Sequence, residues 1–329
     1  MPQRTEIDRV SHTLEKRKRN IIEMPLPSNP ETVDVGTQLV DILHKVFGPQ
    51  PGFRPAHAKG LLLKGRFTPT PEASTLSIAQ HFQQETPILA RFSNATGLPK
   101  IPDTDPNANP RGLAIRFILA ESPRHLHTDI ITHSTPFFPA KDESNAVSFF
   151  TALANGSIKE HLSTHISARE FIEAAKPSPR SLGSEQFFGI NAFKLVSADG
   201  GETFIRYRII PRQGVSYLSS EELEKLDESY FFDSVTDILG QGPIFDIVVQ
   251  IAEEGDVTDN CTIRWPETRK LVKIGMISFD RVVDDNAAEQ KKIIFDPVPR
   301  VVGIEPSDDP LIDVRAALYL ISGRERRAA

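Results

Sequence analysis

The strand-forming segments are the feature that most constrains the fold of this chain of 329 residues. Runs rich in β-branched and aromatic residues, in part alternating between apolar and polar, occur in both halves. They cover residues 57–67, 87–93, 112–119, 125–132, 190–196, 204–211, 245–252 and 271–279. Segments with helical periodicity lie between the two groups and near both ends of the chain. This order of elements by itself predicts an α+β fold.

Two of the expected helices have clear boundary signals. Residues 31–47 place apolar side chains on one face, and the pattern stops at Gly48, which can leave a helix, and Pro49, which cannot continue one. Near the other end, Asp309 and Pro310 can start a helix. Further helices are expected at residues 144–153, 158–164, 168–175, 219–226 and 230–239.

Composition and charge exclude several classes of protein. The net charge of −6 and the lack of a large basic region argue against nucleic acid as a partner. The basic run at residues 16–19 is expected to be a solvated part of an N-terminal arm, residues 1–30. The single cysteine, Cys261, excludes an internal disulfide and fits a cytoplasmic, reducing compartment. No apolar run is long enough for a transmembrane helix, and no signal-peptide core is present.

Arg315 and Tyr319 stand four residues apart in the last expected helix, so their side chains share one face. A guanidinium beside a phenol hydroxyl favours the phenolate. A phenolate is a hard anionic ligand for ferric iron, and tyrosine is one of the residues by which proteins hold haem. This spacing is also common in simple surface packing. The pair gains weight from a second segment, Arg-Pro-Ala-His-Ala-Lys-Gly at residues 54–60.

These two segments resemble the haem catalases, whose distal histidine lies in a run similar to Arg54 to Gly60, at the position of His57. Further motifs between them match in the same order. They are Thr-Pro-Ile-Leu-Ala-Arg-Phe-Ser at residues 86–93, Pro-Arg-Gly at 110–112, Trp-Pro at 265–266, Phe-Asp-Pro at 295–297 and Gly-Ile-Glu-Pro-Ser at 303–307. The resemblance implies a closed antiparallel β-barrel of about eight strands with surrounding helices, and a single haem-binding domain over residues 31–329.

The resemblance also implies how the cofactor, haem b with ferric iron, is held. Tyr319 is the expected iron ligand, and Arg315 is expected to keep its phenolate anionic. Three arginines match the family's propionate-binding positions, where a guanidinium offers two parallel hydrogen bonds to a carboxylate. They are Arg54, Arg91 and Arg326.

Aromatic residues are expected to wall the haem pocket, although core packing elsewhere accounts for each of them equally well. They are Phe137, Phe138 and Phe149.

On the distal side, the resemblance assigns His57 as the proton shuttle that helps to break the peroxide O–O bond. Ser93 lies where the family has a hydroxyl that orients this histidine, and Asn94 beside it could serve instead. His133 stands at the family's distal asparagine position, in His-Ser-Thr-Pro. An imidazole there can accept or donate a proton near neutral pH, so weak dismutation of hydrogen peroxide is expected. Equally, His133 could turn away from the iron and pack.

A different reading of the same strand is a metal site, because alternate residues of a strand share a face. The candidate ligands are His125, His127, Asp129 and His133. Four ligands along one strand cannot all converge on one ion without a bend, which weighs against this site.

The chain departs from full-length catalases in its reduced N-terminal arm and in ending ten residues after Tyr319. It is therefore expected to be a compact catalase-related peroxidase that uses a peroxide and a small organic reductant or hydroperoxide, with a homodimer as a possible assembly. One alternative is a fatty-acid hydroperoxide isomerase or dehydrase, similar to the allene oxide synthases. Another is a haem- or lipid-binding barrel without turnover.

Overall fold

A closed ring of antiparallel strands forms the centre of the computed structural model, which describes residues 25–123 and 125–329. Each strand pairs with the next around the ring, and β9 returns to β1. In ring order the described strands are β1 (Gly60–Pro69), β2 (Thr86–Ser93), β3 (Gly112–Ala120), β4 (Leu126–His133), β5 (Phe187–Phe188), β7 (Glu202–Pro211), β8 (Pro243–Ile251) and β9 (Leu271–Val282). The expected closed barrel is confirmed.

One expected strand lies outside the ring. The segment predicted at residues 190–196 forms β6 (Phe193–Val196), which pairs with the first half of β7 and with β10 (Ile304–Pro306). Its place in the ring is taken by β5, joined to β4 by the single pair His133 and Phe188. Two residues are too short for a strand periodicity to reveal, which is why β5 was not predicted.

Side chains alternate between the barrel interior and its outer surface, as strand geometry requires. Phenylalanines fill the interior and make tilted or edge-on ring contacts with one another. Phe67, Phe92, Phe117, Phe245 and Phe279 are all at most 1% exposed. The opposite parity on β2, β3 and β4 faces outward, toward the helices.

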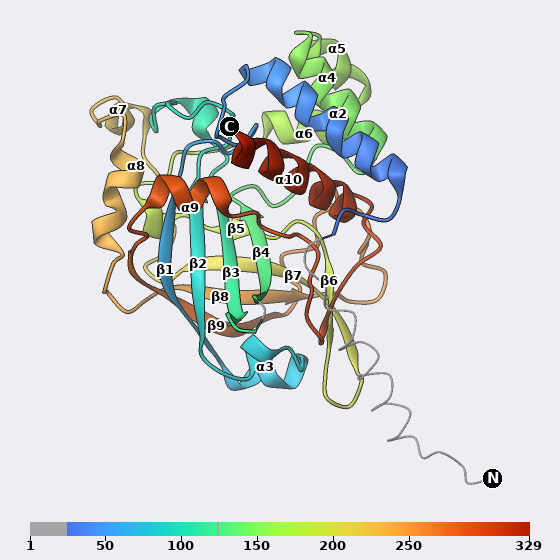
Figure 1. Cartoon of the computed structure of the whole chain (residues 1–329), viewed down its shortest axis with the longest axis vertical. Helices are drawn as coiled ribbons and strands as arrows, with labels where there is room; N and C mark the ends of the chain where they lie inside the picture. Colours follow the sequence, from blue (N-terminus) through green and yellow to red (C-terminus); the bar gives the residue numbers. More distant parts are fainter. Residues whose placement is uncertain (1–24, 124) are drawn as a thin grey trace, which may run out of the picture.

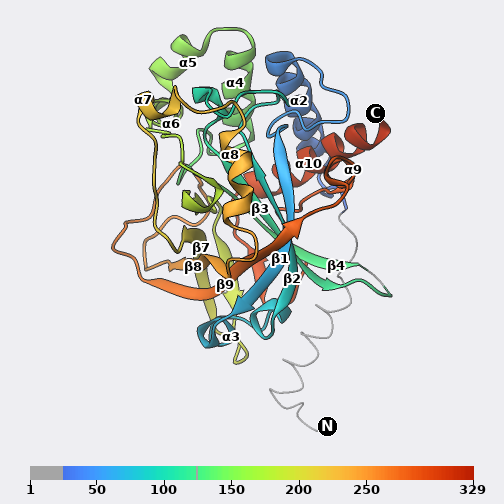
Figure 2. The ribbon, with the colours of Figure 1, turned by 90° about the vertical axis from the view of Figure 1, so that its left-hand side faces the viewer.

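Helices cover one end and one side of the barrel. Figures 1 and 2 show α2, α4 and α5 at one end, α10 between them and the barrel, and α3 at the opposite end. The described α-helices are α2 (Pro30–Phe47), α3 (Pro71–Leu76), α4 (Glu143–Ala154), α5 (Ile158–Thr164), α6 (Ile166–Glu173), α7 (Ser220–Leu223), α8 (Tyr230–Asp233), α9 (Asn286–Lys292) and α10 (Leu311–Ala328). Helix α2 begins after the N-cap Asn29 and ends at Phe47, where the C-cap Gly48 leaves the helix with a φ of 75°.

The crossing of α2 and α10 is close because Gly36 has no side chain. A Cβ there would lie 2.7 Å from Cβ of Ala317. The helices expected at residues 219–226 and 230–239 are shorter than predicted, since α7 and α8 span four residues each. The short helices α3 and α9 were not predicted.

Residues 1–24 lie outside the described part of the chain, and with them the basic run at residues 16–19 and most of the expected arm. Across residues 25–123 and 125–329, none of the helices has the length and apolar character that a membrane crossing requires.

Candidate functional site

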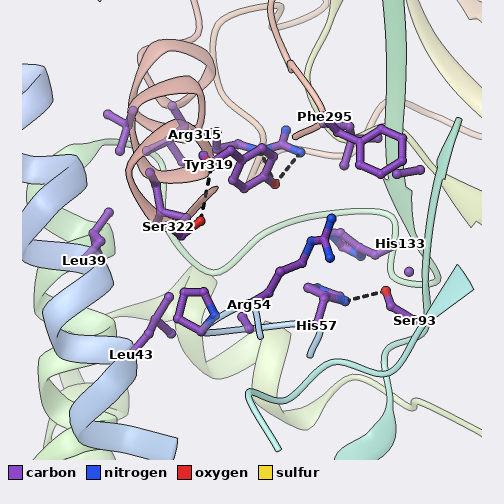
Figure 3. Close-up of a pocket in the computed structure, with 18 of the residues that line it drawn as sticks. Leu39, Leu43, Arg54, His57, Ser93, His133, Phe295, Arg315, Tyr319 and Ser322 are labelled. Atoms are coloured by element: carbon purple, nitrogen blue, oxygen red, sulfur yellow. Dashed lines mark hydrogen bonds between the residues drawn. The ribbon is translucent and has the colours of Figure 1, made fainter. Parts of the chain in front are cut away.

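A largely apolar cavity lies between the outer face of the barrel and the helices α2, α4 and α10. The barrel contributes residues from β2, β3 and β4, including Gly112 and Ile131, and the helices contribute Leu39, Phe150 and Val314. Figure 3 shows Tyr319 and Arg315 on the α10 side and His57 with Ser93 on the opposite side. Segments more than 200 residues apart in the sequence therefore meet at one cavity.

On the α10 wall, Arg315 donates hydrogen bonds from Nε and Nη2 to Oη of Tyr319, at 3.3 and 3.2 Å. The third nitrogen, Nη1, donates to Oδ1 of Asn191. Asn191 in turn donates to Oδ2 of Asp309 at 2.8 Å, and both residues are buried, 2% and 4% exposed. This chain of bonds fixes the guanidinium against the phenol oxygen and concentrates positive charge there.

Asn191 and the role of Asp309 in this chain were missed by the sequence analysis. Asp309 also starts the helix, as the sequence predicts, because its Oδ1 accepts from the backbone N–H of Leu311 at 3.0 Å. Burial raises the pKa of Asp309 above its usual range, and the hydrogen bond from Asn191 opposes that shift.

On the opposite wall, His57 is held from two directions. Its Nδ1 lies 3.0 Å from Oγ of Ser93, and its backbone N–H donates to the carbonyl of Ala95 at 3.0 Å. Its φ of 56° is unusual for a residue other than glycine, and such strain is often found at functional positions. Burial first, then the nearby Arg91 and Arg54, lowers the pKa of His57 to about 4, so the ring is neutral at pH 7.

Gly112 makes room for this pair. A Cβ on Gly112 would lie 2.6 Å from Oγ of Ser93 and 3.0 Å from Nδ1 of His57. Any larger residue would push the serine or the imidazole out of place. This contact gives a physical reason for glycine at the end of the Pro-Arg-Gly motif.

Asn94, the alternative partner of His57, is directed elsewhere. Its amide donates to Oδ1 of Asp103 at 2.8 Å, and its Oδ1 accepts from the buried Arg111. Asp103 also pairs with Lys59 at 2.7 Å. Asn94 therefore belongs to a buried ion-pair network behind this wall, and Ser93 is the hydroxyl that contacts His57.

His133 lines the same cavity and lies close to His57. Charge repulsion from His57 contributes to lowering the pKa of His133. The backbone N–H of Thr135 donates to its Nδ1 at 3.1 Å, so a neutral ring carries its proton on Nε2. Burial lowers the pKa of His133 to about 3, and its Nε2 is buried without a hydrogen-bond partner among the described residues. The expectation that His133 changes protonation near neutral pH is therefore wrong: desolvation keeps it a neutral N–H donor.

Three arginines gather at the edge of the cavity around the end of α9. Arg54 donates to the carbonyls of Gln290 and Ile293, at 3.2 and 2.9 Å, and Arg326 donates to those of Lys291 and Ile293, at 3.0 and 2.7 Å. Arg91 donates to Oε1 of Gln290 at 2.8 Å. Within the described residues none of the three forms an ion pair with a carboxylate.

These arginines repel one another at close range. After burial, the neighbouring Arg91 and Arg326 lower the pKa of Arg54 well below its usual range, and the pKa of Arg91 falls to about 9. Gathering cations without a counterion is costly, so the cluster indicates a buried anion. The two carboxylates of a bound cofactor would supply this negative charge. The apolar wall with a phenol oxygen suits a flat iron macrocycle. The residues present therefore fit haem.

The expected aromatic wall is only partly correct. Phe138 lines the cavity, but Phe149 turns away and packs against Phe171 and His161. Its neighbour on α4, Phe150, lines the cavity instead, because consecutive helical residues point about 100° apart. Phe137 likewise packs elsewhere, with its ring under the guanidinium of Arg264.

The alternative metal site on β4 is not formed. Among the described residues no group of three or more histidine, cysteine, aspartate or glutamate side chains could hold an ion. Asp129 instead accepts two hydrogen bonds from Arg116, at 2.9 and 2.7 Å. This salt bridge occupies the carboxylate that the metal would have needed.

Comparisons with known proteins identify relatives of this chain. A family model described as catalase matches residues 50–329. A catalase-related peroxidase of Mycolicibacterium paratuberculosis is 32% identical over 299 residues, 88% of this chain and 94% of that protein. A catalase-related peroxidase of Synechococcus elongatus is 29% identical, over 88% of each protein.

Solved structures show the same fold. A fungal catalase matches with a TM-score of 0.74 at 21% identity, over 84% of this chain and 59% of that one. A bacterial catalase matches with a TM-score of 0.73 at 22% identity, over 99% of this chain and 62% of that one. This chain thus covers less than two thirds of either structure.

Proposed function

The chain belongs to the catalase family, and from that premise we propose that it is a haem-dependent peroxidase acting on hydrogen peroxide or organic hydroperoxides. That it is a catalase-type oxidoreductase follows from the family itself. The observation that carries the proposal is the pairing of two walls: Arg315 with Tyr319 on one side of the cavity, His57 with Ser93 on the other.

The α10 wall and the three arginines would hold haem b. Oη of Tyr319 would bind the ferric iron, and the two hydrogen bonds from Arg315 stabilise negative charge on that oxygen. Arg54, Arg91 and Arg326 would hold the propionates. When bound, the haem supplies a ferric centre at which the O–O bond of a peroxide is cleaved. Because these residues come from both ends of the described chain, we place residues 31–329 in one haem-binding domain.

His57 moves the proton. With Nδ1 donating to Oγ of Ser93, the lone pair of Nε2 is free to accept the hydroxyl proton of a peroxide. The ring then delivers this proton to the departing oxygen, which leaves as water or an alcohol. A lowered pKa of about 4 makes the protonated ring a ready donor in that second step. Ser93 fixes the tautomer and the ring plane.

His133 offers a fixed hydrogen bond to the peroxide. Its Nε2–H resembles the amide N–H of the family's asparagine, but the ring is held by Thr135 and cannot turn to present an acceptor. One fixed donor is sufficient to orient a peroxide for O–O cleavage. We therefore propose weak dismutation of hydrogen peroxide and stronger turnover with organic hydroperoxides and added reductants.

The test is an absorption spectrum and steady-state turnover of haem-loaded protein. Wild type should show a ferric tyrosinate-haem spectrum and oxidise an added reductant with peroxide. His57→Ala should keep the spectrum and lose about two to four orders of magnitude in O–O cleavage, the usual worth of a positioned proton shuttle. Ser93→Ala should lose less. Near-normal turnover by His57→Ala would refute the assignment.

Products distinguish the rival reactions on the same scaffold. A fatty-acid hydroperoxide should be reduced to its alcohol only when a reductant is present. Its conversion to an allene oxide without reductant would replace the peroxidase proposal by an isomerase or dehydrase. A haem spectrum with no turnover of any peroxide would leave a binding protein.

A further inference from the structure

A second cavity lies on the other side of the segment that carries Arg54. It is lined by Phe53 and Lys59 from that segment, by Pro99 and by Ala288 and Lys291 from the α9 region. Its volume is about 410 Å³, within the range of roughly 300–1,000 Å³ that is usual for small-molecule sites. Arg54 lines both this cavity and the haem cavity, so the two are one side chain apart.

The second cavity is cationic and partly apolar. None of the described residues that line it is acidic, whereas Arg54, Lys59 and Lys291 carry positive charge. The ammonium of Lys59 is engaged by Asp103 at 2.7 Å. The ammonium of Lys291 has no carboxylate or hydrogen-bond partner in the described residues. A free cation beside an apolar wall suits a small molecule with an anionic group and an apolar body.

The apolar part of the wall is aromatic and accessible. Phe53 is 47% exposed. The other apolar lining residues include Pro99, Ala287 and Ala288. A half-exposed phenylalanine in a cavity wall offers a face on which a flat ring can stack. The ligand class that meets both features is an aromatic carboxylate.

The backbone connects this cavity to the cluster of Arg54, Arg91 and Arg326. The carbonyl of Lys291 accepts from Nε of Arg326 at 3.0 Å, and that of Gln290 accepts from Arg54 at 3.2 Å. The Gln290 side chain bridges Nε of Arg91 and the carbonyl of Gly60. A molecule bound here therefore lies against the same few residues that would hold the haem propionates, outside the cavity that haem fills.

We propose that this second cavity is the electron-donor site of the enzyme and binds small phenolic carboxylates. The inference rests on the proposed function. Two phenol molecules each give up one electron and one proton, and the peroxide takes both electrons and both protons. Its O–O bond breaks to yield one alcohol and one water, or two waters from hydrogen peroxide, together with two phenoxyl radicals.

The decisive experiment measures binding with haem-loaded protein by calorimetry, using ferulate and its uncharged methyl ester. Lys291→Glu tests the site, and Lys292→Glu is the matched control, because Lys292 is adjacent, pairs with Glu289 and does not line the cavity. Ferulate should bind wild type. Its affinity should fall about tenfold in Lys291→Glu and change less than about twofold in Lys292→Glu. The affinity for methyl ferulate should be the same in both variants as in wild type.

Steady-state kinetics give the second readout. In Lys291→Glu the KM for ferulate should rise about tenfold while kcat and the KM for peroxide stay unchanged. Equal weakening by the two variants, or no ferulate binding to wild type, would overturn the site. If ferulate binds as expected but wild type oxidises neither donor, the proposed peroxidase function fails while the binding site stands.

Discussion

Acid should destabilise this protein in part through His81, which lies in the barrel interior. The residue is 0% exposed, and its ring centroid is 4.3 Å from that of Phe82 and 4.5 Å from that of Phe117. Neither ring nitrogen has a hydrogen-bond partner among the described residues. Burial lowers the pKa of His81 from 6.5 to about 3, so the folded protein holds the ring neutral.

The sign follows from the difference in proton binding. Below pH 6.5 the unfolded chain protonates His81 and the folded protein does not, so the free energy of unfolding falls as pH drops. Each pH unit between the two pKa values is worth about 1.4 kcal/mol. Integrated from pH 7 to pH 5, His81 alone should cost about 2 kcal/mol, and its contribution should level off below pH 3.

The assay is equilibrium denaturation of haem-loaded wild type and His81→Leu at pH 7 and pH 5. The variant should lose about 2 kcal/mol less than wild type between the two pH values. Replacing the exposed His125 by leucine is the control and should leave the loss unchanged. Identical pH dependence in wild type and His81→Leu would refute the reasoning, since it would mean that the folded protein admits a proton to the barrel interior.

Three further predictions concern the haem cavity. Tyr319→Phe should lose haem or its ferric phenolate absorption bands, whereas an unchanged spectrum would exclude this residue as the iron ligand. Gly112→Ala should keep haem but lose at least about tenfold in O–O cleavage, because its Cβ would lie 2.6 Å from Oγ of Ser93; wild-type rates would show that this wall relaxes freely. Asn191→Leu should weaken the hold on Arg315 and shift the ferric absorption bands, and bands identical to wild type would show that Arg315 needs no such support.

The main elements and several site residues were accessible from the sequence because their signals are local. Strands of eight or more residues such as β2 and β3 show their periodicity directly, and α2 has an N-cap and a C-terminal glycine at its ends. Arg315 and Tyr319 meet through helical spacing alone, and the structure gives the predicted contact. By contrast, β5 and α9 are too short to be recognised, although β5 closes the ring and α9 gathers the three arginines.

Residues that act through distant partners escaped the sequence analysis. Asn191 contacts Arg315 from 124 positions away, and Gln290 contacts Arg91 from 199 positions away. No local pattern marks an amide for such a contact. The same holds for the choice of Phe150 over Phe149, which depends on how α4 is rotated against α2 and the barrel.

The sequence by itself determined where the main strands and helices form, and therefore which side chains stand at their ends. Propensity, capping and periodicity act over a few neighbouring residues and can be recognised along the chain. Only the tertiary structure decided their chemical states. Whether His133 titrates near neutral pH depends first on desolvation and then on repulsion from His57 and Arg315, which together lower its pKa to about 3. Protonation is set by solvent access and by charges brought together through folding, and neither quantity exists along an extended chain.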